Sequence, residues 1–377
     1  MTKDTTVQVK LTIGVDVSDE YSHICVLDDA GNIMEQSRIS TTKAAYRMRF
    51  GLCCPLSRIA IEAGMHSRWI AFLLHDLGHE IIVANPRKLR LIYKNDSKDD
   101  KIDAEYLARV ARMDVKLLSP IQHRKDSVQH DLAIVRARDT LVQVRTKLIN
   151  TMRGMLKTTG QRLPKITAAA FGRKVIELIP QELQPALKPL AEAVEDMSQR
   201  ILAYDKLINR RAKTYPEVDA LRQINGVGPI TALAYITTID DPFRFKKSRT
   251  VGSFLGLRPR RDESGESKPE LRITKAGNTY LRRLLVGCAQ YILGPFGKDC
   301  DIRRWGLAIA QGKVPSKDSN QAAVKRTVKP GKSARKRAVV GVARKLAVLL
   351  HRLWVTGQTY EPFRNSQPVV NDEAVAA

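Results

Sequence analysis

The sequence has few cysteines, no long apolar run and too few acidic residues to balance its basic ones. Its five cysteines include no Cys-x-x-Cys spacing, and their number is odd. This pattern excludes a disulfide framework or a zinc ribbon as the main organiser of the fold. No apolar stretch approaches the ~18 residues of a membrane-spanning helix. Residues 1–10 are polar and lack the apolar region of a signal peptide, so we expect a cytoplasmic protein.

The excess of basic residues lies in one part of the chain. The 377 residues hold 64 Lys and Arg against 39 Asp and Glu, a formal net charge of +25. Residues 1–115 hold 16 of each sign, so the whole excess falls after residue 115. Lys and Arg release condensed counterions from phosphates, whereas a charge this polarised increases self-repulsion without helping a fold. A nucleic acid is therefore the expected partner.

The apolar pattern of the first part predicts an α/β domain. Short β-rich runs fall at residues 11–17, 22–28, 33–39, 58–62 and 80–84. Apolar residues recur at helical spacing between the last two runs, and a further helix is predicted soon after them, at residues 102–113. Three early strands, followed by strands that alternate with helices, predict a mixed sheet with helices packed on it.

The second part of the chain has the pattern of long helices. Residues 126–160 carry one apolar stripe at helical spacing, and residues 187–208 carry another. The two helices can pair as a hairpin, or pack as a coiled coil with a partner chain. A last helix is predicted at residues 339–355, after a basic stretch at residues 313–337 that we expect to be mobile in isolation.

Four acidic residues in the first part end apolar strands or begin a helix. Asp16 ends the first strand and Glu62 ends the fourth, while Asp100 and Asp103 share one face of a helix. Each acid alone fits a turn, an ion pair or a solvated helix start. Buried acids are costly unless they are paired or bound to a metal, and hard divalent ions prefer oxygen ligands. Together the four predict a site for Mg²⁺, with two ions expected and Mn²⁺ as the alternative.

A second candidate site is a basic loop that contains Ser264, followed by Gly265. A hydroxyl among cations is well placed to meet a phosphodiester, because the cations stabilise the charge that develops on it. Local composition alone is more typical of a plain turn, with Ser264 as a turn residue before Gly265. The candidate nucleic-acid contacts around this loop are Arg258, Arg260, Arg261, Lys268, Arg272, Lys275 and Arg282.

A Gly-x-Gly turn formed by Gly226 and Gly228 precedes another predicted helix. Such a turn exposes backbone N–H groups that can hold a phosphate, as in the helix–hairpin–helix of non-specific DNA binders. The alternative is a simple turn before a core helix.

These motifs resemble those of a bacterial insertion-sequence transposase family. Residues 14–16, 61–63 and 98–104 are similar to its N-terminal Asp-Glu-Asp-Asp (DEDD) domain, and the Ser264 loop is similar to its C-terminal domain. Asp99 stands where the family usually has Thr, which creates two possible registers. The spacing of Lys98, Asp100 and Asp103 favours Asp100.

The resemblance implies a fold and a domain order. A ribonuclease H-like (RuvC-like) domain would occupy residues 1–115, followed by a helical hairpin or coiled coil for oligomerisation at residues 116–215. A basic transposase domain with a helix–hairpin–helix-like part would occupy residues 216–365, before a tail at residues 366–377.

The resemblance also implies a function. Its family cuts and rejoins DNA, is related to Piv-type DNA invertases and is linked to a structured bridge RNA. In this chain Asp16, Glu62, Asp100 and Asp103 would hold Mg²⁺, and Ser264 would attack the DNA. Strand exchange cuts several strands together, so we expect a dimer or tetramer. The alternatives are a metal-dependent junction endonuclease that uses water, and a nucleic-acid-binding protein without activity.

Overall fold

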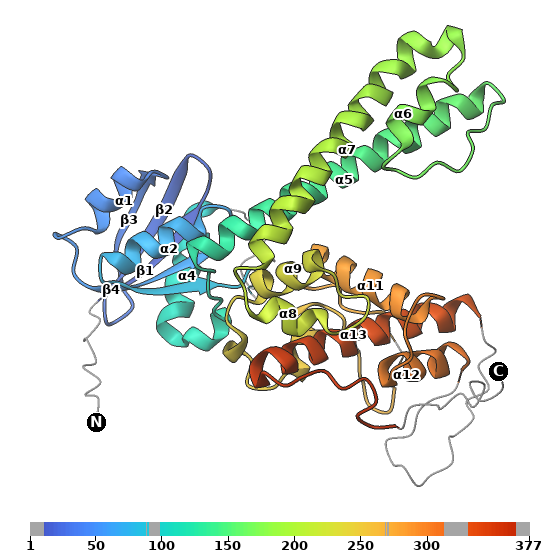
Figure 1. Ribbon diagram of the computed structural model, residues 1–377. Helices are drawn as coiled ribbons and strands as arrows, with labels where there is room; N and C mark the ends of the chain where they lie inside the picture. Colours follow the sequence, from blue (N-terminus) through green and yellow to red (C-terminus); the bar gives the residue numbers. More distant parts are fainter. Residues whose placement is uncertain are drawn as a thin grey trace. The chain divides into compact units, whose positions relative to one another are not determined.

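The computed structural model describes residues 11–87, 89, 99–267, 269, 271–312 and 331–366. The chain divides into two compact units, with the boundary between Arg124 and Lys125. The first unit holds a β-sheet with helices on both faces, and the second is mainly helical (Figure 1). This order of an α/β part before a helical part is the predicted one. The finer division into three domains and a tail stays a prediction.

Five strands form one mixed sheet in the order β3-β2-β1-β4-β5. β2 (Tyr21–Leu27) pairs antiparallel with β1 (Leu11–Val17) and β3 (Ile33–Ser40). β4 (Ser57–Glu62) pairs in parallel with β1 and with β5 (Glu80–Ala84). The mixed sheet is therefore confirmed, with strand ends close to those predicted. It is consistent with a ribonuclease H-like domain.

Side-chain alternation along the strands separates two layers of helices. Ile13 packs with α1 (Lys43–Phe50) and α2 (Ser67–Asp76) on one face of the sheet. Residues of the opposite parity face α4 (Asp100–Met113), which crosses β1 and β2 on the other face. The sequence analysis missed α1, which is short and begins after the capping side chain of Thr42. Because strand side chains alternate with a period of two, Asp16 lies on the same face as α4.

Helix α4 approaches β1 closely because residue 14 has no side chain. A Cβ at Gly14 would lie 2.0 Å from the carbonyl oxygen of Ala104 and 2.5 Å from the amide nitrogen of Ala108. Both alanines are fully buried. The absence of a side chain on the strand and the small side chains on the helix fix the start of α4 near the ends of β1 and β4.

A long antiparallel helix pair forms part of the second unit. α5 (Asp126–Thr158) and α7 (Gln184–Ala212) lie side by side, with α6 (Phe171–Ile176) packed on α7 (Figure 1). The far ends of the pair enclose a small core of their own, which includes Met152 and Phe171. The hairpin thus exists within this chain, and packing with a partner chain stays a prediction.

The other helices of the second unit surround one buried centre. They are α8 (Glu217–Arg222), α9 (Pro229–Ile239), α10 (Arg249–Phe254), α11 (Thr279–Leu293), α12 (Asp301–Ala310) and α13 (Lys332–Thr356). The 3₁₀ turns are η1 (Val115–Leu118) in the first unit, and η2 (Gln181–Leu183) and η3 (Pro242–Arg244) in the second. α9 is buried from Thr231 to Ile239, and Tyr235 donates a hydrogen bond to the Ala347 carbonyl at 2.6 Å.

The start of α13 differs from the predicted one. The helix begins at Lys332 and not at the predicted residue 339, so residues 332–337 of the basic stretch are helical in the folded chain. Ala334 and Ala338 are buried there, and this packing stabilises a segment that the basic composition alone would not. Residues 313–330 of that stretch lie outside the described residues. None of the described helices is both long enough and apolar enough to cross a membrane.

We predict that Gly14→Ala destabilises the first unit by about 2–3 kcal/mol, because the new methyl group meets backbone that cannot move without shifting α4. The matched control is Gly64→Ala, where a Cβ meets nothing within 4 Å. Urea unfolding can be followed by the fluorescence of Trp69 after Trp305 and Trp354 are replaced by Phe. Equal stability of the two alanine variants would contradict the close crossing.

Candidate active site

The ends of two neighbouring strands bring two acids together. β1 and β4 are parallel, with Val15 opposite Ile61. Asp16 and Glu62 come directly after these two residues, so they lie at the same edge of the sheet. Both have the parity that faces α4, and both are partly buried. Asp100 and Asp103 lie in the first turn of α4. Three elements therefore present four carboxylates at one edge of the sheet.

Electrostatics show that the four acids act on one another. Burial raises the pKa of Asp16, and the negative charges of Asp100, Asp103 and Glu62 raise it further, to about 6. A backbone hydrogen bond from Val17 opposes this shift. Asp16 therefore holds its proton to a higher pH than an ordinary aspartic acid does. A cation at this edge would remove the repulsion that keeps the proton there.

Asp99 has a different role from its neighbours. Its side chain accepts a hydrogen bond from the Lys101 amide at 3.0 Å and caps α4. The charges of Asp100 and Asp103, in contrast, both raise the pKa of Asp16. This supports the register in which Asp100 belongs to the site. Lys98, which the motif also used, lies outside the described residues.

His23 was missed by the sequence analysis and lies beside the acids. It is paired with Asp16 across β1 and β2, and its Nδ1 is 3.7 Å from the nearer Asp100 carboxylate oxygen. Within the described residues that buried Nδ1 has no hydrogen-bond partner. The available signal was its position in β2, because β2 residues of this parity face α4.

The acids fit a divalent cation in chemistry but do not form a finished site. Carboxylate oxygens are the ligands that Mg²⁺ prefers, and Asp16, Glu62, Asp100 and Asp103 supply only such donors. Their repulsion is the energetic reason for a cation to bind. Among the described side chains, no group of three or more His, Cys, Asp or Glu has the geometry to hold one metal ion. A bound ion would therefore have to draw the carboxylates together.

Ser264 lies at the end of a two-stranded hairpin in the second unit. The strands pair through Pro259 and Ile273, and Ser264 and Ser267 exchange backbone hydrogen bonds of 3.3 and 3.0 Å across the turn. Gly265 has a φ of 53°, which favours glycine, and a Cβ there would meet nothing within 4 Å. The described residues from 258 to 272 are exposed on this hairpin. The Ser264 hydroxyl is thus presented to solvent.

The base of the hairpin is locked to the helices. Cβ atoms at Gly256 and Gly277 would lie 2.2 Å and 1.9 Å from backbone carbonyl oxygens, and both residues have positive φ. Arg282, predicted to contact nucleic acid, is only 9% exposed. Its guanidinium donates to the carbonyls of Leu255 and Ala276 at 3.0 and 2.8 Å. Arg282 therefore positions the hairpin base.

The other predicted nucleic-acid contacts are placed in two areas. The exposed ones on the hairpin are Arg258, Arg260, Arg261, Arg272 and Lys275, while Lys268 lies outside the described residues. Gly226 has a φ of 94°, and Gly228 caps α9. Both line a cavity of about 490 Å³ together with Arg283 and Tyr291. The turn between α8 and α9 is thus accessible, with one cation at its border.

The mixed sheet with four acids at one edge is consistent with a nuclease-like DEDD transposase domain. A family model described as "Transposase", DEDD_Tnp_IS110, matches residues 13–160. A second model, described as "Transposase IS116/IS110/IS902 family", matches residues 218–297, which include the hairpin.

Curated relatives agree with both family models. The chain is 30% identical to the transposase for insertion sequence element IS1328 of Yersinia enterocolitica, over 74% of this chain and 82% of the relative. It is 27% identical to the transposase for insertion sequence element IS1111A of Coxiella burnetii, over 74% of this chain and 77% of the relative. It is also 26% identical to a probable family 20 transposase of Pseudomonas aeruginosa, over 83% of this chain and 92% of the relative. The chain belongs to the IS110/IS116/IS902 family of insertion-sequence transposases.

We predict that the metal-free protein loses stability as the pH rises from about 4 to about 6, relative to Asp16→Asn. The folded state holds the Asp16 proton up to a pKa of about 6, whereas the ordinary pKa of an aspartic acid side chain is 3.8. Ionisation of Asp16 is therefore unfavourable in the folded state, and the difference should reach about 1 kcal/mol and then level off, after a reduction for solvent screening. Urea unfolding at several pH values measures it. Asp76→Asn, which removes an exposed carboxylate, should keep the pH profile of the unmodified chain. If the difference in unfolding free energy between the unmodified chain and Asp16→Asn does not change with pH, the four acids do not repel one another in this way.

Proposed function

We propose that this transposase cuts and rejoins DNA with Ser264 as the nucleophile and with Mg²⁺ held by Asp16, Glu62, Asp100 and Asp103. The position of the four carboxylates, at the ends of β1 and β4 and in the first turn of α4, is the observation that carries the proposal. The exposed position of Ser264 among arginines supports the second part. The acids and the serine belong to different units, and the proposal leaves open whether one chain or two supply them.

The four acids would hold the metal and so set the position of the scissile phosphate. Bound Mg²⁺ supplies Lewis-acid stabilisation of charge on that phosphate. Asp16 and Glu62 lie on rigid strands, whereas Asp100 and Asp103 belong to the first turn of α4. The positive end of the α4 dipole lies at this turn and offsets part of the negative charge.

The serine would split strand exchange into two transfers. The Ser264 oxygen forms a bond to phosphorus and loses its proton to a base, while the bond from phosphorus to the departing strand oxygen breaks and that oxygen takes up a proton. The phosphoserine ester conserves the energy of the phosphodiester bond, so a hydroxyl of the new strand can reverse the step without a nucleotide cofactor. The exposed Arg258, Arg260 and Arg261 can stabilise the charge on the phosphate.

The proposal extends to the partners that the sequence predicts. The excess positive charge after residue 115 suits DNA and a structured guide RNA, because both are polyanions. We also propose a cytoplasmic dimer or tetramer, since strand exchange needs several strands cut together, with α5 and α7 as part of the contact. A relation to Piv-type invertases would follow from the same chemistry.

We predict a covalent protein–DNA adduct on nicked substrates that carry the element ends. The adduct should resist denaturation and map to the peptide that contains Ser264. Ser264→Ala should abolish it and reduce strand transfer by at least about 100-fold, because no other group replaces the nucleophile. Ser267→Ala is the matched control, since Ser267 lies directly across the same turn, and it should keep the adduct. Efficient cleavage by Ser264→Ala without any adduct would favour the metal-dependent junction endonuclease.

We predict that replacing Asp16, Glu62, Asp100 or Asp103 by Ala abolishes cleavage and changes DNA affinity less than about twofold. The affinity should persist because the excess positive charge lies after residue 115. Asp99→Ala should cost about 1 kcal/mol of stability through the lost cap but remain active. Gel-shift and plasmid-cleavage assays test both parts. An active Asp100→Ala beside an inactive Asp99→Ala would show that the register is wrong.

A further inference from the structure

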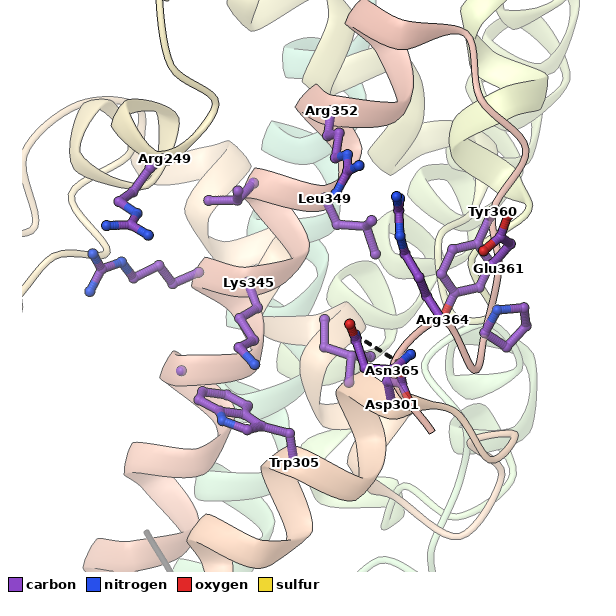
Figure 2. A pocket seen from close by; sticks show the side chains of 15 residues that line it. Arg249, Asp301, Trp305, Lys345, Leu349, Arg352, Tyr360, Glu361, Arg364 and Asn365 are labelled. Atoms are coloured by element: carbon purple, nitrogen blue, oxygen red, sulfur yellow. Dashed lines mark hydrogen bonds between the residues drawn. The ribbon is translucent and has the colours of Figure 1, made fainter. Parts of the chain in front are cut away.

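A cavity of about 540 Å³ lies in the second unit, between α12, α13 and the C-terminal segment 357–366 (Figure 2). Lys345, Leu349 and Arg352 recur at helical spacing on the face of α13 that lines it. The C-terminal segment is held in place by hydrogen bonds to α12, from the Asp301 amide to the Pro362 carbonyl at 2.8 Å and from the Asn365 amide to Asp301 at 2.7 Å. The cavity therefore has three ordered walls, and its volume suits a ligand of nucleotide size.

The charges on the walls of this cavity are unbalanced. Asp301 and Glu361 are its acids, and Asp301 already accepts hydrogen bonds from Asn365 and from the Ser366 hydroxyl. Its cations are Arg249, Arg344, Lys345, Arg352 and Arg364. Within the described residues, no ion pair joins any of these four arginines to an acid. Such a concentration of unpaired guanidinium groups favours a phosphate-bearing ligand.

An aromatic surface accompanies the cations. The Lys345 ammonium lies 3.8 Å from the centre of the Trp305 ring, and Figure 2 shows it directed at that ring. The ring comes close to α13 because residue 341 is glycine, where a Cβ would lie 3.0 Å from it. Desolvation lowers the pKa of Lys345, while Asp301 raises it. A phosphate nearby can draw the ammonium away from the ring and so free a flat apolar face.

We propose that this cavity binds one unstacked nucleotide of a single-stranded nucleic-acid segment. The phosphate contacts Arg344 and Arg352, the Lys345 ammonium moves to it, and the base stacks on Trp305. A duplex keeps its bases stacked inside the helix and cannot offer a base to the face of the Trp305 ring. Stacking also accepts any base, so the site recognises an open strand without reading its sequence. The cavity contains none of the candidate catalytic residues, so the inference does not depend on the serine mechanism.

The test uses the full chain, without metal, and short single-stranded DNA and RNA oligonucleotides that contain 2-aminopurine. Arg344→Gln combined with Arg352→Gln should weaken binding about tenfold and lower the slope of the log–log salt dependence by about 0.7, the contribution of one neutralised phosphate on a single strand. The matched control is Arg335→Gln combined with Lys336→Gln, two exposed cations of α13 that do not line the cavity. It should change the affinity less than about threefold.

Stacking has a separate readout. The unmodified chain should quench the 2-aminopurine fluorescence, and Trp305→Leu should lose most of that quenching. If Trp305→Leu fails to fold, as judged by circular dichroism, the affinities of the Arg344/Arg352 double variant and of its control still test the inference. Both readouts measure binding without metal and not strand transfer, so their outcome is distinct from that of the proposed function.

Several results would overturn the inference. If the two double variants lose equal affinity for the oligonucleotide, the binding depends on the overall positive charge of the second unit and not on this cavity. A duplex of the same sequence that competes as well as the single strand would exclude an unstacked nucleotide. A free nucleoside monophosphate that binds as tightly as the oligonucleotide would identify a soluble ligand, and an acidic peptide that competes equally would identify a protein partner.

Discussion

The close crossing of α4 over β1 is the constraint on which the candidate metal site depends. Gly14 allows the backbone of Ala104 to lie against the strand, and this contact sets where the first turn of α4 falls. The Asp99 cap begins the helix there, so Asp100 and Asp103 reach the edge that Asp16 and Glu62 already occupy. A side chain at residue 14 would push the helix away, and the four carboxylates would lose their common position.

The two parts of the chain handle charge in opposite ways. The first unit is close to neutral overall and concentrates acids at one edge, where burial and repulsion raise the pKa of Asp16. This arrangement costs stability until a cation binds, which is typical of sites where function and stability conflict. The second unit carries the basic excess, and its hairpin arginines are exposed, so water screens their repulsion at little cost.

Not every cation in the basic part is available to a nucleic acid. Arg282 holds the hairpin base, and Arg138 and Arg283 form ion pairs with Asp205 and Asp139. The burial of Arg282 had a signal in the sequence, because it lies three residues before Leu285 on the apolar face of α11. The cavity beside Trp305 differs, because its arginines come from α10, α13 and the C-terminal segment and form no ion pair within the described residues.

The sequence by itself determined the mixed sheet, the long helices and the family, because strand alternation, helical spacing and local motifs are properties of short segments. It also placed Asp16 and Glu62 at strand ends. It did not reveal His23 beside Asp100, the role of Asp99 as a cap or the helical start of α13. Only the tertiary structure decided these, because each depends on which face of one element packs against another that is distant in sequence.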